Sequence, residues 1–149
     1  MGDFIAEQRL YRRDAHGKHI LPVGGFFAVA HKADSDRLIY DRRPMNSLEK
    51  VFKYRARLPH GTCFTKLALA PSQTVRGSLD DLRCFFYCLQ QPPGGELLNA
   101  VGRSWRGAQL PIAGLRRHCA YRFCLSVQGM GDHSAVDVAQ HVHESVLRK

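Results

Sequence analysis

The chain of 149 residues is 44% apolar and 23% charged, which is typical of a globular domain with one hydrophobic core. It contains no run of about 18 apolar residues and no apolar segment of signal-peptide type at its start, so neither a membrane-spanning helix nor secretion is expected. Lys and Arg (22) outnumber Asp and Glu (13), and the resulting charge of +9 favours a polyanionic partner such as nucleic acid. We therefore expect an intracellular protein of the cytoplasm or nucleus.

The first third of the sequence predicts an arm followed by a β-hairpin. The N-terminal residues are polar and basic up to Pro22, and two apolar, β-prone runs then flank a cluster of turn residues. The expected elements are an N-terminal arm at 1–22, strands at 26–30 and 37–41 around a turn at 33–36, and a short helix at 47–53.

The remaining sequence predicts loops, one strand and one long helix. Residues 63–70 are compatible with either a strand or a helix, and the amphipathic pattern near the C-terminus predicts a helix capped by Ser134 or Asp132. The expected elements are a loop-rich stretch at 58–78, an apolar and aromatic segment at 79–90, a short helical piece at 96–101, a basic glycine-rich connection at 102–115, a strand at 117–127, a tight turn at 129–132 and a helix at 133–147.

The five cysteines form no C-x-x-C pair, and their number is odd. A zinc site made of Cys119, Cys124 and His133 would have unusual spacing, and disulfides are disfavoured in a reducing compartment. We therefore expect reduced thiols that are mostly buried.

A basic segment at the end of the second predicted strand is the first candidate site. Arg37, Asp41 and Arg43 are closely spaced there and are followed by Asn46. A guanidinium is always charged and can hold two phosphate oxygens at once, and a nearby carboxylate can orient neighbouring arginines. The segment predicts a phosphate-binding surface, although clusters of this kind are more often solvated faces.

The apolar and aromatic segment is the second candidate site. Asp81 either ends a strand as a metal-binding carboxylate, with Phe86 five positions later, or helps to cap a helix together with Asp80. Carboxylate oxygens are ligands that suit Mg²⁺. In the helical alternative, the aromatic residues would belong to the core.

Two further segments have features of a nucleic-acid site. Glycines flank Met130 in the predicted turn, and glycine allows backbone to adopt unusual dihedral angles close to a ligand. Arg103 and Arg106 surround Trp105 in a pattern that can stack a base, although the tryptophan could equally belong to the core.

In this order, three of these segments resemble the reverse-transcriptase family of RNA-directed DNA polymerases. The resemblance rests on Arg37, Asp41, Arg43 and Asn46 in the fingers pattern R-x-x-x-D-x-R-x-x-N, on Asp81 and Phe86 in the first palm motif, and on Met130, Gly131 and Gln140 in a later palm motif. It covers residues 26–147. The sequence departs from the family pattern at three positions. Some members have a second acidic residue where this chain has Cys84, and a proline is usual where it has Gly129. Asp132 adds a negative charge near the expected phosphate site.

The resemblance implies an α+β fold in which residues 23–149 form a fingers β-hairpin and an incomplete palm. This palm would be an antiparallel sheet backed by helices, with Asp81 on a strand beside 117–127. Asp81 would be the catalytic, Mg²⁺-binding residue, and the bulk of Phe86 would favour deoxynucleotides. The implied nucleotide contacts are Arg37, Asp41, Arg43, Phe86, Met130 and Gly131, and the residues expected to contact an RNA template or an RNA–DNA hybrid are Asn46, Arg103, Arg106 and Gln140.

The family's second catalytic motif, aromatic-x-Asp-Asp, does not occur in this sequence, whose one Asp-Asp pair is Asp80-Asp81. A two-metal site needs further carboxylates, so we expect a polymerase fragment that is inactive alone and that another polymerase segment would have to complete. The first alternative is a non-catalytic, basic nucleic-acid-binding module. The second is a small globular protein unrelated to polymerases.

Overall fold

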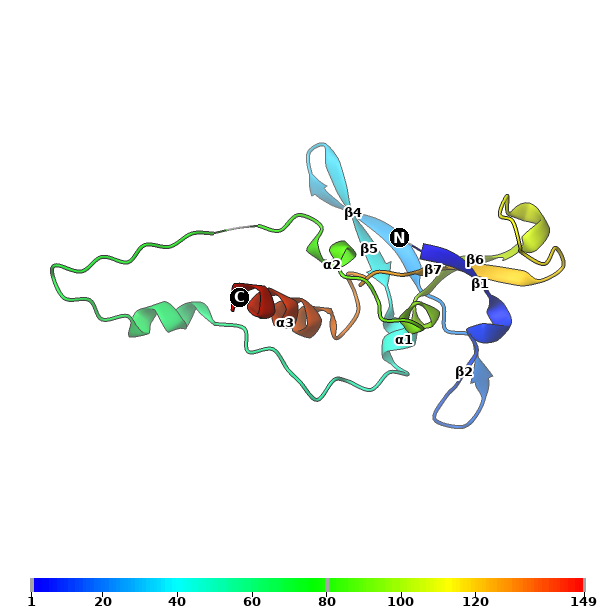
Figure 1. The fold of residues 1–149 in the computed structure, drawn as a ribbon, viewed down its shortest axis with the longest axis horizontal. Coiled ribbons are helices and arrows are strands. Elements are labelled where there is room, and N and C mark those ends of the chain that lie inside the picture. Colours follow the sequence, from blue (N-terminus) through cyan, green and yellow to red (C-terminus); the bar gives the residue numbers. More distant parts are fainter. Residues whose placement is uncertain (1, 80, 149) are drawn as a thin grey trace.

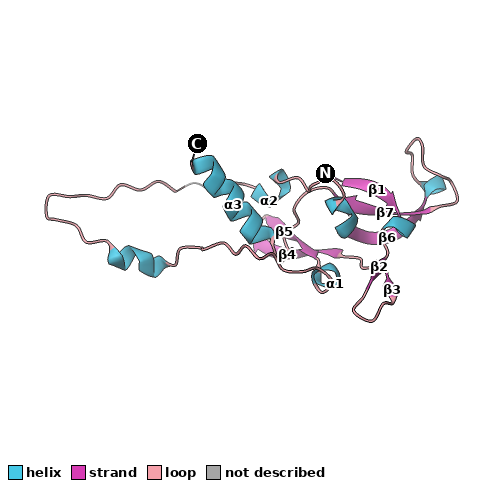
Figure 2. Ribbon diagram, turned by 60° about the horizontal axis from the view of Figure 1, so that its bottom comes forward, coloured by secondary structure: helices cyan, strands magenta, loops and turns pink. Residues whose placement is uncertain are grey.

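The computed structural model describes residues 2–79 and 81–148, and it combines antiparallel sheets with few helices (Figures 1 and 2). The strands are β1 (Gly2–Ala6), β2 (Arg12–Arg13), β3 (His19–Ile20), β4 (Gly25–Lys32), β5 (Ser35–Asp41), β6 (Ala100–Arg106) and β7 (Ala120–Leu125). The helices are α1 (Arg43–Asn46), α2 (Phe85–Cys88) and α3 (Ala135–Leu147), with 3-10 turns η1 (Glu7–Arg9), η2 (Gly61–Lys66), η3 (Gly95–Leu98) and η4 (Gly107–Gln109). None of the helices in these residues has the length and apolar character needed to cross a membrane.

The main sheet has the order β1-β7-β6, with β7 in the middle and antiparallel to both neighbours. Residues 2–6 of the expected N-terminal arm form an edge strand of this sheet. Ile5 is buried in the core on one face, whereas Phe4 lies opposite Phe123 on the other face. This short alternation within a polar leader is a real strand signal that the surrounding charges obscured.

The strand β6 takes up the first part of the connection that was expected at 102–115, as far as Arg106. It pairs with β7 at Val101 and again at Trp105, and the register shifts between these residues. Gly102 adopts a positive φ of 71° within this irregularity, a conformation that favours glycine. The irregularity interrupts the two-residue periodicity, so the strand could not be recognised from its pattern.

The predicted β-hairpin is confirmed as β4 and β5, which pair from Gly25 with Asp41 to Lys32 with Ser35, with an irregularity in the register between Ala30 and Lys32. Much of it is exposed, and Figure 1 shows its tip projecting from the rest of the fold. Tyr40 anchors its base, since this side chain is only 1% exposed and packs with Val101 and Leu125 of the main sheet. The base of the hairpin also meets the sheet through the bridge between Gly24 and Val101.

A second apolar cluster lies on the opposite face of the main sheet. It contains Ile5, Leu10, Ala100 and Cys124, and Leu21 and Leu97 pack against it. The two clusters together are small for a chain of this length, and many large apolar side chains outside them remain exposed.

The segment between α1 and α2 forms a long excursion from the core, which Figure 1 shows as an extended loop. The helix expected at 47–53 instead occupies Arg43–Asn46, where Pro44 lies in the first turn and has no N–H to leave unpaired. The loop-rich character of 58–78 is confirmed, and the undecided stretch contains the 3-10 turn η2. The loop is attached to α3 by Asp137, which accepts hydrogen bonds from the Ala56 backbone (2.7 Å) and from Arg55 (3.1 Å).

The C-terminal predictions are confirmed in β7 and in α3, which begins at Ala135 rather than at 133. Between them, Asp132 N–H donates to the Gly129 carbonyl (3.3 Å), so the chain turns sharply before the helix. The Ser134 side chain makes no capping hydrogen bond, but its N–H donates to the Asp132 carboxylate at 2.7 Å.

A buried arginine connects the hairpin, the sheet and this turn. Arg42 is only 3% exposed, and its guanidinium donates to both carboxylate oxygens of Glu49 at 2.6 Å and to the Asn99 side chain at 2.7 Å. It also donates to Asn46 (2.8 Å) and lies 3.5 Å from Asp132. Burial by itself would lower the pKa of Arg42, but these acidic partners raise it overall, so the group stays charged.

Asn99 extends this network into the sheet. Its side chain is fully buried, accepts from Arg42 and donates to the Leu125 carbonyl at 3.4 Å. A buried charge is tolerated only when its donors are satisfied, and Arg42 meets this condition through several separate segments. The relative position of these segments therefore depends on one side chain.

The expectation of mostly buried cysteines is wrong. Cys63, Cys84 and Cys88 are exposed and Cys119 is half-buried, so Cys124 is the buried thiol among the described residues. No disulfide joins them in this part of the chain. Burial raises the pKa of Cys124 to about 11, so its thiol is protonated at neutral pH.

Replacing Glu49 tests the buried arginine. In Glu49→Gln the Arg42 charge loses its bidentate partner, and we expect the free energy of unfolding to fall by about 2–4 kcal/mol in urea denaturation. The matched control is Glu144→Gln, which removes the exposed pair with Arg148 and should cost below about 1 kcal/mol. Equal losses in the two variants would contradict the central role of Arg42.

Alkylation of the native protein tests the thiol environments. Thiolate is the reactive form, so at pH 8 the exposed thiols of Cys63, Cys84 and Cys88 should react at least about a hundredfold faster than Cys124. Mass spectrometry of timed samples would measure this, with urea-unfolded protein as the control in which all sites react. Rapid labelling of Cys124 in the folded protein would show that the reagent reaches this thiol, and thus that the apolar cluster around it does not exclude solvent.

Candidate functional site

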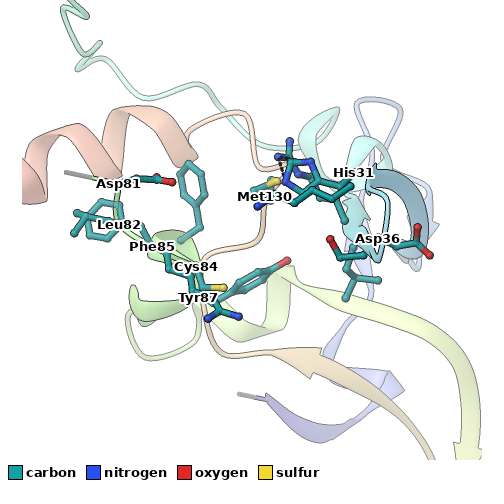
Figure 3. A pocket seen from close by; sticks show the side chains of 14 residues that line it. His31, Asp36, Asp81, Leu82, Cys84, Phe85, Tyr87 and Met130 are labelled. Atoms are coloured by element: carbon teal, nitrogen blue, oxygen red, sulfur yellow. Dashed lines mark hydrogen bonds between the residues drawn. The ribbon is translucent and has the colours of Figure 1, made fainter. Parts of the chain in front are cut away.

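A cleft of about 940 Å³ lies between the β4–β5 hairpin and the segment that leads into α2 (Figure 3). Residues near the hairpin tip form one wall, residues 81–87 form the other, and Met130 of the turn before α3 completes the lining. Three segments that are distant in the sequence therefore meet at one place. Arg37, Asp81, Phe86 and Met130, which the sequence singled out, all line this cleft.

Arg37 is the principal cation of the hairpin wall. It lies on β5, which places its side chain on the exposed surface near the tip, and its guanidinium is 3.2 Å from each ring nitrogen of His31. Within the described residues it forms no ion pair with a carboxylate. Its charge is thus held in place by His31 and remains free to meet an anionic ligand.

Asp81 is the acid of the opposite wall, but it does not lie on a strand as expected. It belongs to an irregular stretch before α2, and Asp80 lies outside the described residues. The reason lies in the sheet, because β1 and β6 occupy both edges of β7 and leave no place for a further strand beside it. In Figure 3 the Asp81 carboxylate points into the cleft, whereas that of Asp36 points away from it.

The short helix α2 brings aromatic side chains to the cleft. Cys84 precedes it in a left-handed conformation with φ 56°, which is uncommon for a residue other than glycine and turns the chain sharply. Phe85, Phe86 and Tyr87 are half-buried and line the cavity. These rings make the second wall apolar apart from Asp81 and Arg83.

The turn that carries Met130 is fixed against the hairpin by its glycines. A Cβ atom at Gly129 would overlap the Tyr40 ring, and one at Gly131 would overlap the Tyr40 carbonyl oxygen. Gly131 also has a φ of 131°, a region that side chains rarely adopt. Asn46 secures the same turn by donating to the Gly131 carbonyl at 2.8 Å.

Asp41 and Arg43, which were expected to contact a nucleotide, do not line the cleft. Arg43 donates from Nε (2.8 Å) and from its terminal nitrogen (2.6 Å) to the Asp41 carboxylate, forming a bidentate pair at the junction of β5 and α1. These hydrogen bonds hold the pKa of Asp41 at about 2, so the pair persists over the whole neutral range. Its geometry indicates that it shapes the junction.

The residues expected to contact nucleic acid are also placed outside the cleft. Asn46 is engaged with Arg42 and Gly131, and Gln140 donates to Glu144 within α3 at 2.9 Å. Arg103 and Arg106 lie on β6, where the Arg103 guanidinium sits 3.6 Å from the centre of the Trp105 ring. Gly131, expected to contact a nucleotide, adjoins the cleft through Met130 but is not part of its lining.

Sequence reasoning missed several residues that matter for the site. His31, Lys32 and Arg83 add basic groups to the cleft lining, but nothing in their spacing distinguishes them from other surface residues. The pairing of Arg42 could have been suspected from the sequence, because Glu49 is the one acidic residue between Asp41 and Asp80. An isolated acid in so basic a stretch favours a specific pairing.

One group of side chains has the spacing of a metal site but the environment of an ion pair. Ligand atoms of Glu49, Asp132 and His133 lie within 4.8 Å of one another. Arg42 already donates to Glu49 and adjoins Asp132, so its guanidinium supplies the positive charge that a metal ion would bring. These residues are better explained as part of the buried network.

The cleft therefore combines a cation and an acid that have no ion-pair partner among residues 2–79 and 81–148 with aromatic rings, around a cavity large enough for a small organic ligand. The cation can bind phosphate or carboxylate oxygens, and the acid can hold a hard cation such as Mg²⁺. Comparisons with models of known protein families, with curated proteins and with solved structures found no match.

Replacing Gly131 tests how the turn is held. Gly131→Ala adds both a strained backbone and an overlap with Tyr40, and we expect a loss of about 3 kcal/mol in the free energy of unfolding. Gly17→Ala is the matched control, because Gly17 has a φ of 76° but no atom within 4 Å of an added Cβ. Its cost should be about 1 kcal/mol by thermal or urea unfolding, and a similar cost at both sites would contradict the close contact with Tyr40.

Proposed function

We propose that the cleft binds the triphosphate of a deoxynucleotide together with Mg²⁺, and that the chain is the fingers and front palm of a reverse-transcriptase-like polymerase. The observation that carries this proposal is the convergence of Arg37, Asp81, Phe86 and Met130 on one cavity. These residues come from the three separate segments that resemble the family. An unrelated fold would have no reason to gather them.

The basic wall supports triphosphate binding. Arg37 has no competing carboxylate among the described residues, and His31 orients its guanidinium, so little reorganisation is needed when phosphate oxygens arrive. Lys32 and Arg83 lie in the same lining and add positive charge. A phosphate chain spanning the cleft would place its oxygens between the cations of the hairpin wall and Asp81.

Asp81 is suited to share a magnesium ion with such a ligand. Mg²⁺ commonly retains several waters and is held by one or two carboxylates together with substrate phosphates. Asp81 fits this pattern because its carboxylate is exposed, unpaired among the described residues and directed into the cleft. The ion would bridge the acid and the phosphates and neutralise their mutual repulsion.

The aromatic wall supports selection for the sugar. Phe86 is half-buried in the lining, so its ring is held in place rather than free to move into solvent. A ring below the sugar would crowd a 2′-hydroxyl and favour deoxynucleotides over ribonucleotides.

The proposal covers binding and not a complete catalytic cycle. The described residues direct one carboxylate into the cleft, which is insufficient for the two-metal arrangement of a polymerase, so another polymerase segment would have to supply further acids. If the cleft binds nucleic acid without nucleotide chemistry, the chain is a basic binding module. The response to Mg²⁺ separates these two functions.

Calorimetric titration with a deoxynucleoside triphosphate tests the proposal. Binding should require Mg²⁺, and Arg37→Ala should weaken it by about 1.5–3 kcal/mol, which is roughly ten- to a hundredfold, because a charged hydrogen-bond donor is lost. Arg13→Ala, on the separate β2–β3 hairpin, is the matched control and should bind as the parent does.

Asp81→Asn gives the sharper result because its effect depends on the metal. With Mg²⁺ it should weaken nucleotide binding, whereas without Mg²⁺ it should leave binding unchanged or slightly tighter, since a negative charge near the phosphates is removed. An equal effect under both conditions, or binding that ignores Mg²⁺, would refute the assignment of Asp81 as a metal ligand.

A further inference from the structure

A second surface with the properties of a binding site lies on the main sheet, outside the cleft. Phe4, Phe123 and Trp105 form a row of rings there. Phe4 meets Phe123 edge to face at 5.6 Å between ring centres and meets Trp105 at 6.5 Å. Trp105 is the single tryptophan of the chain, and Arg103 stacks over its ring at 3.6 Å. We call this surface the aromatic face.

The strand register places these rings on the same side of the sheet. Phe4 lies opposite Phe123, and Phe123 lies opposite Val101 on the third strand. Trp105 lies opposite Tyr121, two residues before Phe123 and therefore on the same side. Directly opposed residues of antiparallel strands share a face, so the row follows from the pairing.

The other side of the sheet is already covered. Leu10, which follows η1, and Leu97 of η3 pack there with Ile5 and Cys124. On the aromatic face, Tyr40 at the base of the hairpin packs at the end nearest Leu125, and the connection between β6 and β7 contacts Tyr121. The rings of Phe4, Phe123 and Trp105 are consequently half-buried, each with part of its surface in solvent.

The charged residues that β6, β7 and the connection between them contribute are all basic, and the one acid of the edge strand β1, Asp3, lies opposite Cys124 on the other side of the sheet. Residues 97–131, which include β6, β7 and the connection between them, contain no Asp or Glu. Arg103 of β6 and Arg116 and Arg117 of the connection are all exposed. The connection is held beside the face by Tyr121, whose hydroxyl accepts from the Arg116 backbone at 3.0 Å.

We propose that the aromatic face binds single-stranded nucleic acid, with bases stacking on the rings and phosphates contacting the arginines. Exposed rings interleaved with arginines on a sheet are a platform for unpaired bases, because every base offers a π-face. Charge complementarity favours this partner over a protein, since a protein surface would have to be strongly acidic to match. The inference is independent of nucleotide binding in the cleft.

The apolar surface on which a bound nucleic-acid strand would lie continues from the aromatic face to the β4–β5 hairpin. Phe123 packs against the cluster that contains Tyr40, and the Tyr40 ring lies 5.3 Å from that of Phe26 on β4. Phe26 is exposed. The apolar contacts therefore extend from Trp105 toward the hairpin that carries Arg37.

Quenching of the Trp105 fluorescence tests the proposal directly. The full chain is titrated with oligothymidylate of about a dozen nucleotides, without Mg²⁺ or nucleotide, so that the signal does not depend on the cleft. A base stacked on Trp105 should quench its emission in a saturable manner. Inorganic polyphosphate, which has charge but no bases, should bind without comparable quenching.

Variants separate stacking from charge. Phe4→Leu keeps an apolar side chain but removes a ring, and we expect about tenfold weaker binding with a folded circular dichroism spectrum. Arg103→Ala should weaken binding and reduce its salt dependence, whereas Arg9→Ala, an equal change of charge on η1, should do neither.

Two results would overturn the proposal. One is quenching by polyphosphate equal to that by the oligonucleotide, because the signal would then report charge alone. The other is unchanged oligonucleotide affinity in Arg103→Ala or in folded Phe4→Leu. Arg103→Ala changes an exposed residue, so it keeps the test decisive if Phe4→Leu fails to fold.

Discussion

The structure depends on one buried charge. The Arg42 guanidinium is held by Glu49, Asn46 and Asn99, and it adjoins Asp132, so a single group joins the end of β5, the start of β6 and the turn before α3. An apolar residue could fill the same volume, but it would not fix the direction of each neighbour as five N–H donors do. Because the apolar clusters are small, this directional network carries much of the specificity of the fold.

The network also determines where the cleft forms. Tyr40, two residues before Arg42, packs against the glycines of the turn. This contact fixes the position of Met130 relative to β5. The residues of 37–46 consequently divide into two groups. Asp41, Arg43 and Asn46 hold the chain in shape, whereas Arg37 faces a cavity without a carboxylate partner among the described residues. Residues 37–46 thus supply both the contacts that hold this part of the chain in place and the cation that faces the cleft.

The sequence could predict elements whose signals are local. The β4–β5 hairpin, β7 and α3 each have a regular apolar pattern bounded by turn residues, and each was predicted. The strand β6 was hidden by its irregular register, and β1 was hidden by its polar surroundings. The irregular position of Asp81 follows from strand order, because β1 takes the edge that Asp81 was expected to join. Burial of Arg42 depends on partners from distant segments, and no local pattern encodes such a meeting. The convergence of Arg37, Asp81, Phe86 and Met130 was predicted only through the family resemblance.

We propose that Arg37 and Asp81 hold opposite ends of one metal–nucleotide ligand. Manganese can replace magnesium at oxygen ligands, and its paramagnetism broadens the NMR signals of nearby nuclei. A titration of isotopically labelled protein with a manganese–deoxynucleoside triphosphate complex would therefore map the site. We expect broadening of the NMR signals of four residues that line the cleft, while the Trp105 indole signal stays sharp. The four are His31, Arg37, Asp81 and Met130. Broadening centred on Glu49 and Asp132, or none that depends on the nucleotide, would contradict the proposal.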